Sequence, residues 1–296
     1  MLFSKKIKRI LCIVLAVLFC MPALASCGEN GEASSESPES KGESTAESTA
    51  ESTAESKEEE SKEPEIKAIL PEKDSYKLLF IGNSATSVND IPGTLATLCN
   101  KLGMNVTVKA IVPGGYTLEQ HSNNQAVYTE IEKGYDAVFI QENGTVMIPG
   151  GESAKKSLAA IKKLGEAVNK SGAKFCFYVR PPYGKDLSGV KNFDQCIVFD
   201  EHFTPAAAEN NAECVYVNRS FAYAIKNLSF NLWGPDNAHT GTHGAYLIVC
   251  TFFATVFGRS ATELDTAYGL SLSDAKLLQE AADKIALEGI IPWENN

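Results

Sequence analysis

The sequence has no excess of positive charge. Its 27 lysines and arginines are outnumbered by 37 aspartates and glutamates, which gives a formal net charge of −10. Most of this acidity lies in residues 28–73, which carry fourteen glutamates and five lysines, so the rest of the chain is only mildly acidic. Proteins that bind nucleic acid or anionic membrane surfaces need basic patches that neutralise phosphate. We therefore expect no nucleic acid partner.

The start of the chain lacks an apolar run long enough to span a bilayer, which takes about 20 residues. Its twelve-residue run, Ile10–Met21, follows a basic segment at Lys5–Arg9 and precedes the sequence LASC at Leu24–Cys27. This pattern predicts an export signal peptide over residues 1–26. LASC resembles the bacterial lipobox, and the resemblance implies a lipid on Cys27 that holds the protein on the outer face of the bacterial membrane. An ordinary signal peptide with a chance cysteine is the alternative.

Apolar residues are scarce from Cys27 to residue 73. The segment is rich in Glu, Ser, Thr and Ala, and it repeats the tetrapeptide ESTA over Glu43–Ala54. Such a composition buries too little apolar surface to offset the entropy of ordering. A helix is the alternative because Ala and Glu favour helices, but the segment has no apolar stripe. We predict a disordered, lipid-anchored linker over 27–73 and a single folded domain over 74–296.

Cysteines with metal-binding or disulfide-framework spacing are also missing. After the two cysteines of the export segment and the predicted lipid site Cys27 are set aside, five widely spaced cysteines remain: Cys99, Cys176, Cys196, Cys214 and Cys250. The odd number and the lack of a CxxC pair argue against a disulfide framework and a zinc site. Most lie among apolar residues, where free buried thiols are expected. A single bridge between Cys196 and Cys214 stays open.

Strand-like apolar segments alternate with helical patterns through residues 74–296. The expected strands are 76–82, 105–112, 136–141, 173–180 and 212–218, and the expected helices are 91–102, 117–133, 152–170, 192–210, 243–257 and 273–288. The strands are continuously apolar, which is typical of a parallel sheet buried on both faces. We predict an α/β fold, a three-layer α/β/α sandwich with a five-stranded parallel sheet. Sites in such sheets form at the carboxyl ends of the strands.

A serine stands at the carboxyl end of the first expected strand. The segment LFIGNS, residues 79–84, stops being apolar at Gly82 and ends in Ser84. A serine nucleophile needs a histidine base and an acid that orients it, and the chain has only four histidines. His239 follows Asp236 in a late Gly- and Pro-rich loop that returns to the same sheet edge. Each residue alone fits a cap or a surface loop, but their joint placement favours catalysis.

These segments, in this order, resemble the SGNH (GDSL-type) hydrolase superfamily. The resemblance rests on IGNS, on a Gly-rich turn after the second strand, on a polar segment after the third and on the late D-x-x-H. It implies a flavodoxin-like fold in which Ser84 is the nucleophile, His239 the base and Asp236 the orienting acid. The first block of the family usually reads Gly-Asp-Ser, whereas this chain has Asn83 in the middle position.

The same resemblance implies an oxyanion hole. Its backbone donors would be Ser84 and Gly115, the latter in the segment VPGGYTLEQH after the second strand. The third block of the family usually reads Gly-x-Asn-Asp, but this chain has IQENGT. Gln141 and Asn143 therefore both stay candidates for the side-chain amide donor, and sialate-esterase-like branches also carry a Gln in this segment.

Other polar residues near these segments have two interpretations each. His239 and His243 lie four apart near Asp236, as metal ligands can, but no HExxH pattern is present and we expect no metal. His121 either lines the cleft or packs inside the domain. Arg180, after the fourth strand, either binds substrate or forms an ion pair.

These observations predict an exported, lipid-anchored serine esterase that needs no cofactor. Family analogy favours removal of O-acetyl or other short acyl groups from carbohydrate. Tyr116, Gln141 and Tyr183 would give the cleft polar walls suited to a sugar. A lipase or lysophospholipase is the enzymatic alternative. A non-catalytic glycan-binding lipoprotein is the other, because Asn83 and the third block depart from the family pattern.

Overall fold

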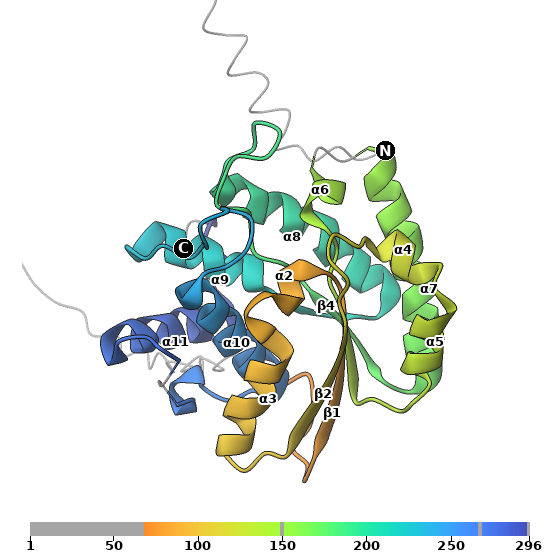
Figure 1. Cartoon of the computed structure of the whole chain (residues 1–296), viewed down its shortest axis with the longest axis horizontal. Coiled ribbons are helices and arrows are strands. Elements are labelled where there is room, and N and C mark those ends of the chain that lie inside the picture. Colours follow the sequence, from red (N-terminus) through yellow and green to blue (C-terminus); the bar gives the residue numbers. More distant parts are fainter. Residues whose placement is uncertain (1–67, 149–150, 266–267, 295–296) are drawn as a thin grey trace, which may run out of the picture. The chain divides into compact units, whose positions relative to one another are not determined.

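The computed structural model describes residues 68–148, 151–265 and 268–294, which form a sheet between two layers of helices (Figure 1). The strands are β1 (Tyr76–Ile81), β2 (Val106–Ile111), β3 (Ala137–Ile140), β4 (Lys174–Tyr178) and β5 (Glu213–Val215). The predicted signal peptide, Cys27 and the predicted linker up to residue 67 lie outside the described residues.

The strands stand in the order β2-β1-β3-β4-β5, and each neighbouring pair runs parallel. This confirms the predicted five-stranded parallel sheet and its flavodoxin-like order. The chain reverses its direction across the sheet at β1, because β2 is added on one side of it and β3 on the other. In such folds, ligands bind outside the carboxyl ends of the strands at this switch point. The loops after β1, β2 and β3 are therefore the place to look for a site.

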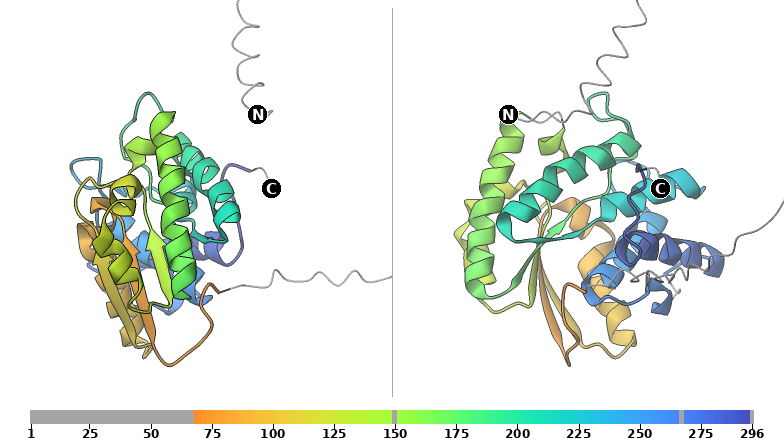
Figure 2. Two further views of the ribbon diagram at one scale, coloured as in Figure 1. Left: turned by 90° about the vertical axis from the view of Figure 1, so that its right-hand side faces the viewer. Right: turned by 180° about the vertical axis from the view of Figure 1, so that it is seen from behind.

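Helices cover both faces of the sheet, as the views from the front and from behind show (Figures 1 and 2). One layer contains α3 (Ile91–Lys101), α9 (Val217–Asn227), α10 (Thr242–Phe257) and α11 (Leu272–Ala286). The other contains α4 (Leu118–Ser122), α5 (Gln125–Ile131), α7 (Glu152–Ser171) and α8 (Asn192–Asn210). Short helices follow the strands or connect the layers: α2 (Ser84–Ser87), η1 (Val88–Asp90), α6 (Gly144–Met147) and η2 (Ala261–Glu263).

Alternate residues of β1 pack against different layers. Leu78 and Phe80 belong to the apolar cluster that includes α10, whereas Leu79 and Ile81 belong to the cluster that includes α7. All four are almost completely buried. A strand that is buried on both faces has no reason to alternate apolar with polar residues, which explains the continuous apolar run in the sequence.

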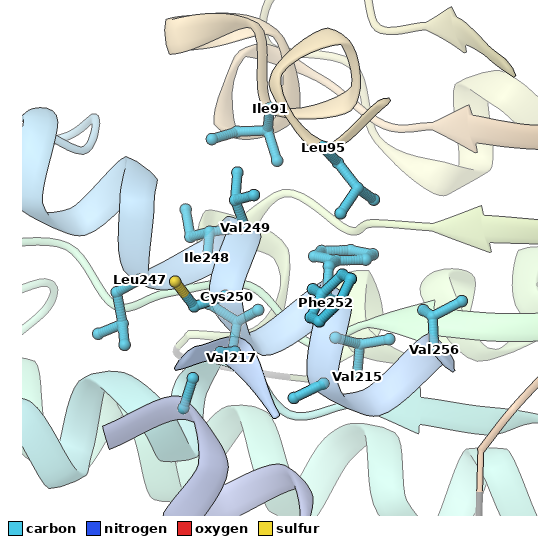
Figure 3. Close-up of a cluster of buried hydrophobic side chains, with 14 of the residues drawn as sticks. Ile91, Leu95, Val215, Val217, Leu247, Ile248, Val249, Cys250, Phe252 and Val256 are labelled. Carbon is cyan, nitrogen blue, oxygen red and sulfur yellow. The ribbon is translucent and has the colours of Figure 1, made fainter. Parts of the chain in front are cut away.

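Helix α10 is apolar on nearly every side. Figure 3 shows its side chains between Ile91 and Leu95 on one side and Val215 and Val217 on the other. A helix that is hydrophobic all round must be enclosed by protein, and α10 lies between the sheet and the neighbouring helices. It ends at Phe257, and the next residue, Gly258, caps it with a positive φ of 64°, which suits glycine. The helix is thus a rigid support for the loop that precedes it.

The folded domain begins earlier than the predicted residue 74. Ile69 and Leu70 are buried, and their backbone N–H groups donate to the carbonyls of Thr255 and Val256 near the end of α10. The ring of Phe257 also packs against the first residue of β1 at 5.0 Å between centroids. The two apolar residues at the end of the predicted linker are thus part of the core, because they continue an apolar surface that α10 presents.

Several elements differ from those expected. The helix expected over 117–133 is divided into α4 and α5, because Asn124 caps α5 by accepting the N–H of Ala126. The strand expected over 212–218 stops at Val215, and the chain turns directly into α9. The four-residue helices α2 and α6 were not expected, since so short a segment shows no periodicity.

The cysteines of the folded domain are free thiols, so Cys196 and Cys214 are not paired. Burial raises the pKa of the Cys99 thiol and that of the Cys214 thiol to about 12 each. Thiols with so high a pKa are poor nucleophiles, and we assign them to packing. Within the described ranges, no helix has both the length and the apolar character needed to cross a membrane.

Candidate active site

The turn after β1 presents Ser84 at the first position of α2. The cap of this helix is Asn83, whose side-chain oxygen accepts the N–H of Ala85 at 3.0 Å. Ser84 is half-buried and is not the capping residue, so the capping interpretation of this serine is wrong. Gly82 is required before it, because a Cβ at this position would lie 2.8 Å from the Gln141 side chain.

The predicted base and acid form a pair in the loop before α10. Nδ1 of His239 lies 2.6 Å from Oδ2 of Asp236, and Oδ1 of the same carboxylate accepts the N–H groups of Ala238 and His239 at 3.0 Å each. The hydrogen bond from the imidazole, with the two backbone bonds, holds the pKa of the Asp236 carboxyl well below its usual range. The acid is therefore ionised at neutral pH and fixes both the tautomer and the orientation of the histidine.

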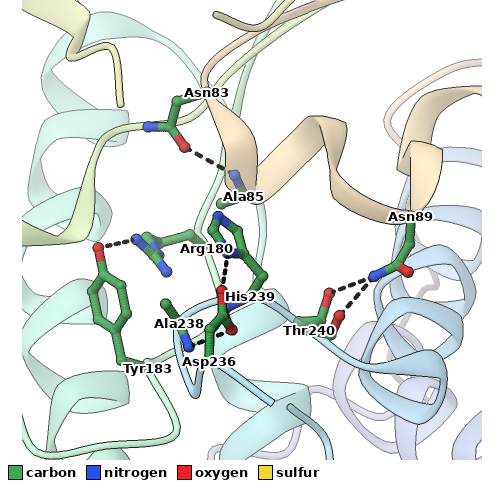
Figure 4. A network of polar contacts seen from close by, with 9 residues as sticks. All are labelled: Asn83, Ala85, Asn89, Arg180, Tyr183, Asp236, Ala238, His239 and Thr240. Carbon is green, nitrogen blue, oxygen red and sulfur yellow. Dashed lines mark hydrogen bonds and ion pairs between the residues drawn. The ribbon is translucent and has the colours of Figure 1, made fainter. Parts of the chain in front are cut away.

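The histidine faces the start of α2. Figure 4 shows the second ring nitrogen of His239 directed toward Ala85. Ala85 is the second residue of α2, and Ser84 is the first. The two loops are also tied to each other, because Asn89 donates through its amide to the carbonyl of Thr240 at 2.7 Å. Among the described residues, no hydrogen bond yet joins Ser84 to His239. Catalytic hydrogen bonds are often long before substrate binds.

The glycine turn after β2 lies against the same edge. Gly115 has a φ of +73°, a conformation that glycine adopts at little cost. Its carbonyl accepts the Asn143 amide at 3.0 Å, and the carbonyl of the next residue, Tyr116, accepts the Asn83 amide at 2.9 Å. The turn is thus fixed between the loops that follow β1 and β3. The role of the Gly115 N–H as an oxyanion donor stays a prediction.

The structure separates the two candidate amide donors. Gln141 is 1% exposed, and its oxygen accepts the Asn83 N–H at 3.1 Å and the Thr86 hydroxyl at 3.0 Å. Its nitrogen donates to the carbonyl of Glu142. Gln141 therefore supports the turn that carries Ser84, and the prediction that it donates to the oxyanion or forms the cleft wall is wrong.

Asn143 remains as the candidate side-chain donor. Its oxygen accepts the N–H and the hydroxyl of Thr145 at 3.1 and 2.9 Å, which caps α6. The oxygen is therefore fixed, and one of the two amide N–H groups is used by Gly115. The second N–H is the group that can serve an oxyanion, because Asn143 is only half-buried.

Two buried groups that hold this edge together lie outside the predicted site residues. Glu142 is fully buried, and one carboxylate oxygen accepts the N–H of Leu118 at 3.0 Å and that of Asn143 at 2.7 Å. Burial raises the pKa of the Glu142 carboxyl. His121 is 1% exposed and donates through Nε2 to the carbonyl of Gly82 at 2.7 Å, while burial lowers the pKa of its imidazole. It packs inside the domain and does not line the cleft.

Two other residues considered from the sequence are His243, as a metal ligand, and Arg180, as a partner in an ion pair. Among the described residues, neither has that role. His243 pairs with Asp274 at 3.2 Å and stacks on Phe230, so it does not join His239 at a metal site. The described ranges contain no group of three or more side chains that could hold a metal ion. Arg180 is buried and forms no ion pair with a carboxylate in those ranges.

No family model matches the chain, and no curated protein matches it in sequence. Solved structures do match its fold. The acetylxylan esterase Axe2 from Geobacillus stearothermophilus has a TM-score of 0.50 at 16% identity, over 63% of this chain and 96% of that one. LAE5, an α/β hydrolase from the metagenome of Lake Arreo, Spain, has a TM-score of 0.50 at 12% identity, over 61% and 94%. The chain thus has the three-layer fold of SGNH-type hydrolases. At sequence identities this low, the likeness shows a shared fold and nothing more.

Proposed function

We propose that the protein is a serine esterase that uses Ser84, His239 and Asp236. The observation that carries the proposal is the Asp236–His239 pair, whose free ring nitrogen is directed at the turn that bears Ser84 (Figure 4). An ionised acid, a histidine of fixed tautomer and a serine at a strand end are the groups that acyl transfer requires.

The reaction proceeds in two steps. His239 takes the proton of Ser84 as its oxygen attacks the ester carbonyl, and then gives that proton to the leaving alcohol. Water then attacks the acyl group on Ser84, with His239 taking a proton from the water. His239 returns that proton to the Ser84 oxygen as the acid leaves. Asp236 stabilises the imidazolium that forms between the two transfers. The N–H groups of Ser84, Gly115 and Asn143 hold the negative oxygen of the tetrahedral intermediate.

We propose an O-acetyl or other short acyl group on a carbohydrate as the substrate. Axe2, which shares the fold, is described as an acetylxylan esterase. The half-buried rings of Tyr116 and Tyr183 and the Asn143 amide give the edge polar and aromatic groups of the kind that sugars contact. We further propose that Cys27 carries lipid and holds the enzyme on the outer face of the bacterial membrane, as the sequence LASC suggests.

Ester hydrolysis by the purified protein tests the proposal. Ser84→Ala and His239→Ala should each lower kcat/KM for 4-nitrophenyl acetate and for acetylated xylooligosaccharides by three or more orders of magnitude. Matched controls are Ser87→Ala, on the same short helix, and His243→Gln, on the next helix along the chain. Both controls should keep wild-type rates.

Other outcomes favour the other functions. Faster cleavage of long-chain than of acetyl nitrophenyl esters would indicate a lipase or lysophospholipase. Glycan affinity without hydrolysis, unchanged by Ser84→Ala, would indicate a glycan-binding protein. The lipid anchor is tested separately by metabolic labelling with an alkyne fatty acid, which Cys27→Ala should abolish.

A further inference from the structure

Arg180 is a buried side chain that carries a positive charge. It follows β4 at the carboxyl edge of the sheet and is 3% exposed. In residues 68–148, 151–265 and 268–294 it makes no ion pair with a carboxylate. A guanidinium stays charged at physiological pH, and a buried charge without a counter-charge is costly. Such an arrangement persists where the charge has another use.

The hydrogen bonds of Arg180 lead to Tyr183. Nη1 donates to the Tyr183 hydroxyl at 2.8 Å, and Nε donates to the carbonyl of Pro181 at 2.9 Å. The guanidinium also lies over the Tyr183 ring, 4.1 Å from its centroid. Figure 4 shows the arginine extending to the phenol oxygen beside the His239 loop. The arginine therefore fixes both the position and the polarity of this tyrosine.

The Tyr183 hydroxyl in turn lies next to the side-chain oxygen of Asn143. Because its oxygen accepts from Arg180, its own O–H is left to donate, and the Asn143 side-chain oxygen lies 3.4 Å away. The loop is packed closely on this pair, since a Cβ at Gly144 would lie 2.7 Å from both Arg180 Nη1 and the Tyr183 ring. The chain of donors runs from the guanidinium through the phenol to the amide oxygen, and each bond polarises the next.

We propose that Arg180 and Tyr183 are positioning residues that orient and polarise the Asn143 amide as an oxyanion donor. The inference rests on the proposed esterase function. A buried cation behind a neutral donor stabilises negative charge that develops in front of that donor, and it acts in a low-dielectric setting without reorganising. Because this charge develops in the transition state, the effect should appear in kcat and leave KM nearly unchanged.

Tyr183→Phe tests the proposal, because it removes the hydroxyl and keeps the ring over which Arg180 lies. We expect kcat for 4-nitrophenyl acetate to fall by about tenfold to a hundredfold, less than the 10²–10³ that loss of a whole oxyanion donor costs. KM should stay within about twofold. The matched control is Tyr128→Phe, whose hydroxyl donates to the Ser122 carbonyl at 2.8 Å; it should keep the wild-type kcat.

A transition-state mimic separates this role from a merely structural one. Ethylboronic acid adds to a serine oxygen as a tetrahedral anion, and its inhibition constant should rise in Tyr183→Phe by the factor that kcat/KM loses. Arg180→Met should lose at least as much activity, since it removes the N–H and the charge together. If that variant does not fold, Tyr183→Phe alone carries the test.

The decisive comparison uses Asn143→Ser, which keeps a cap for α6 and removes the amide. If Tyr183 acts through Asn143, adding Tyr183→Phe to Asn143→Ser should cost almost nothing more. An undiminished effect in that background, or a wild-type kcat in Tyr183→Phe alone, would overturn the inference. Wild-type activity in Ser84→Ala would instead overturn the proposed function.

Discussion

At the scale of single residues, the two oxygens of the Asp236 carboxylate accept different hydrogen bonds. One oxygen accepts two backbone N–H groups and shapes the loop, and the other accepts the His239 ring. The loop geometry and the orientation of the base are therefore separable. An asparagine keeps an oxygen for the backbone but presents an NH₂ group to the imidazole, which then adopts the wrong tautomer.

We predict that Asp236→Asn folds normally and lowers kcat for acetyl esters on the order of 10⁴-fold, as loss of the orienting acid does in serine hydrolases. Steady-state kinetics on 4-nitrophenyl acetate measure the loss. Asp274→Asn is the matched control, because Asp274 pairs with His243 in the second Asp–His pair. Activity in Asp236→Asn within tenfold of the wild type would remove Asp236 from the mechanism.

At the scale of elements, one side chain joins the segments that carry Ser84 and His239, which lie far apart in the sequence. Asn89 lies in η1 with a φ of 62°, and its amide donates to the Thr240 carbonyl, 151 positions further along the chain. The bond holds the loop of His239 against the segment that follows Ser84. Its loss would free one loop relative to the other, and a displacement of about 1 Å can cost 10²-fold in rate.

We predict that Asn89→Gly, which keeps the left-handed backbone accessible, lowers kcat by about tenfold or more while the unfolding temperature changes little. Kinetics and thermal unfolding measured on the same samples check this. Asn105→Gly provides the control, because Asn105 has a φ of 54° and lies before β2, at the opposite end of the sheet. Equal rates in both variants would mean that the bond does not position the base.

Most of the long elements were predictable from sequence, but α9, whose start was included in the strand expected over 212–218, and the shortest helices were not. The strands and α3, α7, α8, α10 and α11 lie within a few residues of their expected ranges, since burial on both faces or on one face leaves a clear apolar pattern. Helices α2 and α6 have four residues each and are fixed by the caps Asn83 and Asn143. A cap depends on where the neighbouring loops lie, which a local pattern does not report.

The site divides in the same way. Asp236 and His239 are three positions apart, so their hydrogen bond is a local matter that the sequence already suggests. The choice between Gln141 and Asn143 was not local. It depends on Asn83 and Thr86, which take up the oxygen of Gln141 from another strand end. Likewise, nothing in the sequence indicates that Arg180 donates to the Tyr183 hydroxyl, or that this hydroxyl lies next to the side-chain oxygen of Asn143.

At the scale of the whole molecule, histidines that are partly or fully removed from solvent link stability to pH. Burial lowers the pKa of the His202 imidazole from 6.5 to about 4, and its nearest polar partner is the Ser157 hydroxyl at 3.3 Å. Between these two values the unfolded chain binds a proton at this residue and the folded domain does not. The stabilisation is therefore complete above about pH 6.5 and is lost as the pH falls toward 4.

We predict that the free energy of unfolding falls from pH 6.5 to pH 4, by up to about 1.4 kcal/mol per pH unit from this histidine. Urea unfolding at several pH values measures the slope. The slope should become shallower in His202→Gln, and His121, whose pKa burial also lowers, accounts for part of the remainder. An unchanged slope in His202→Gln would show that His202 is protonated in the folded domain at these pH values.

The attachment of Ile69 and Leu70 to the end of α10 has a practical consequence. Helix α10 starts just after the His239 loop, and its 16 residues carry the chain away from the candidate site to the place where Ile69 and Leu70 bind. At 1.5 Å per residue this is roughly 24 Å. A reporter, a display scaffold or a solid support fused ahead of Ala68 would thus leave the domain from the side remote from Ser84. If the proposed esterase function holds, protein immobilised in this way should accept bulky polymeric substrates as readily as the free protein does.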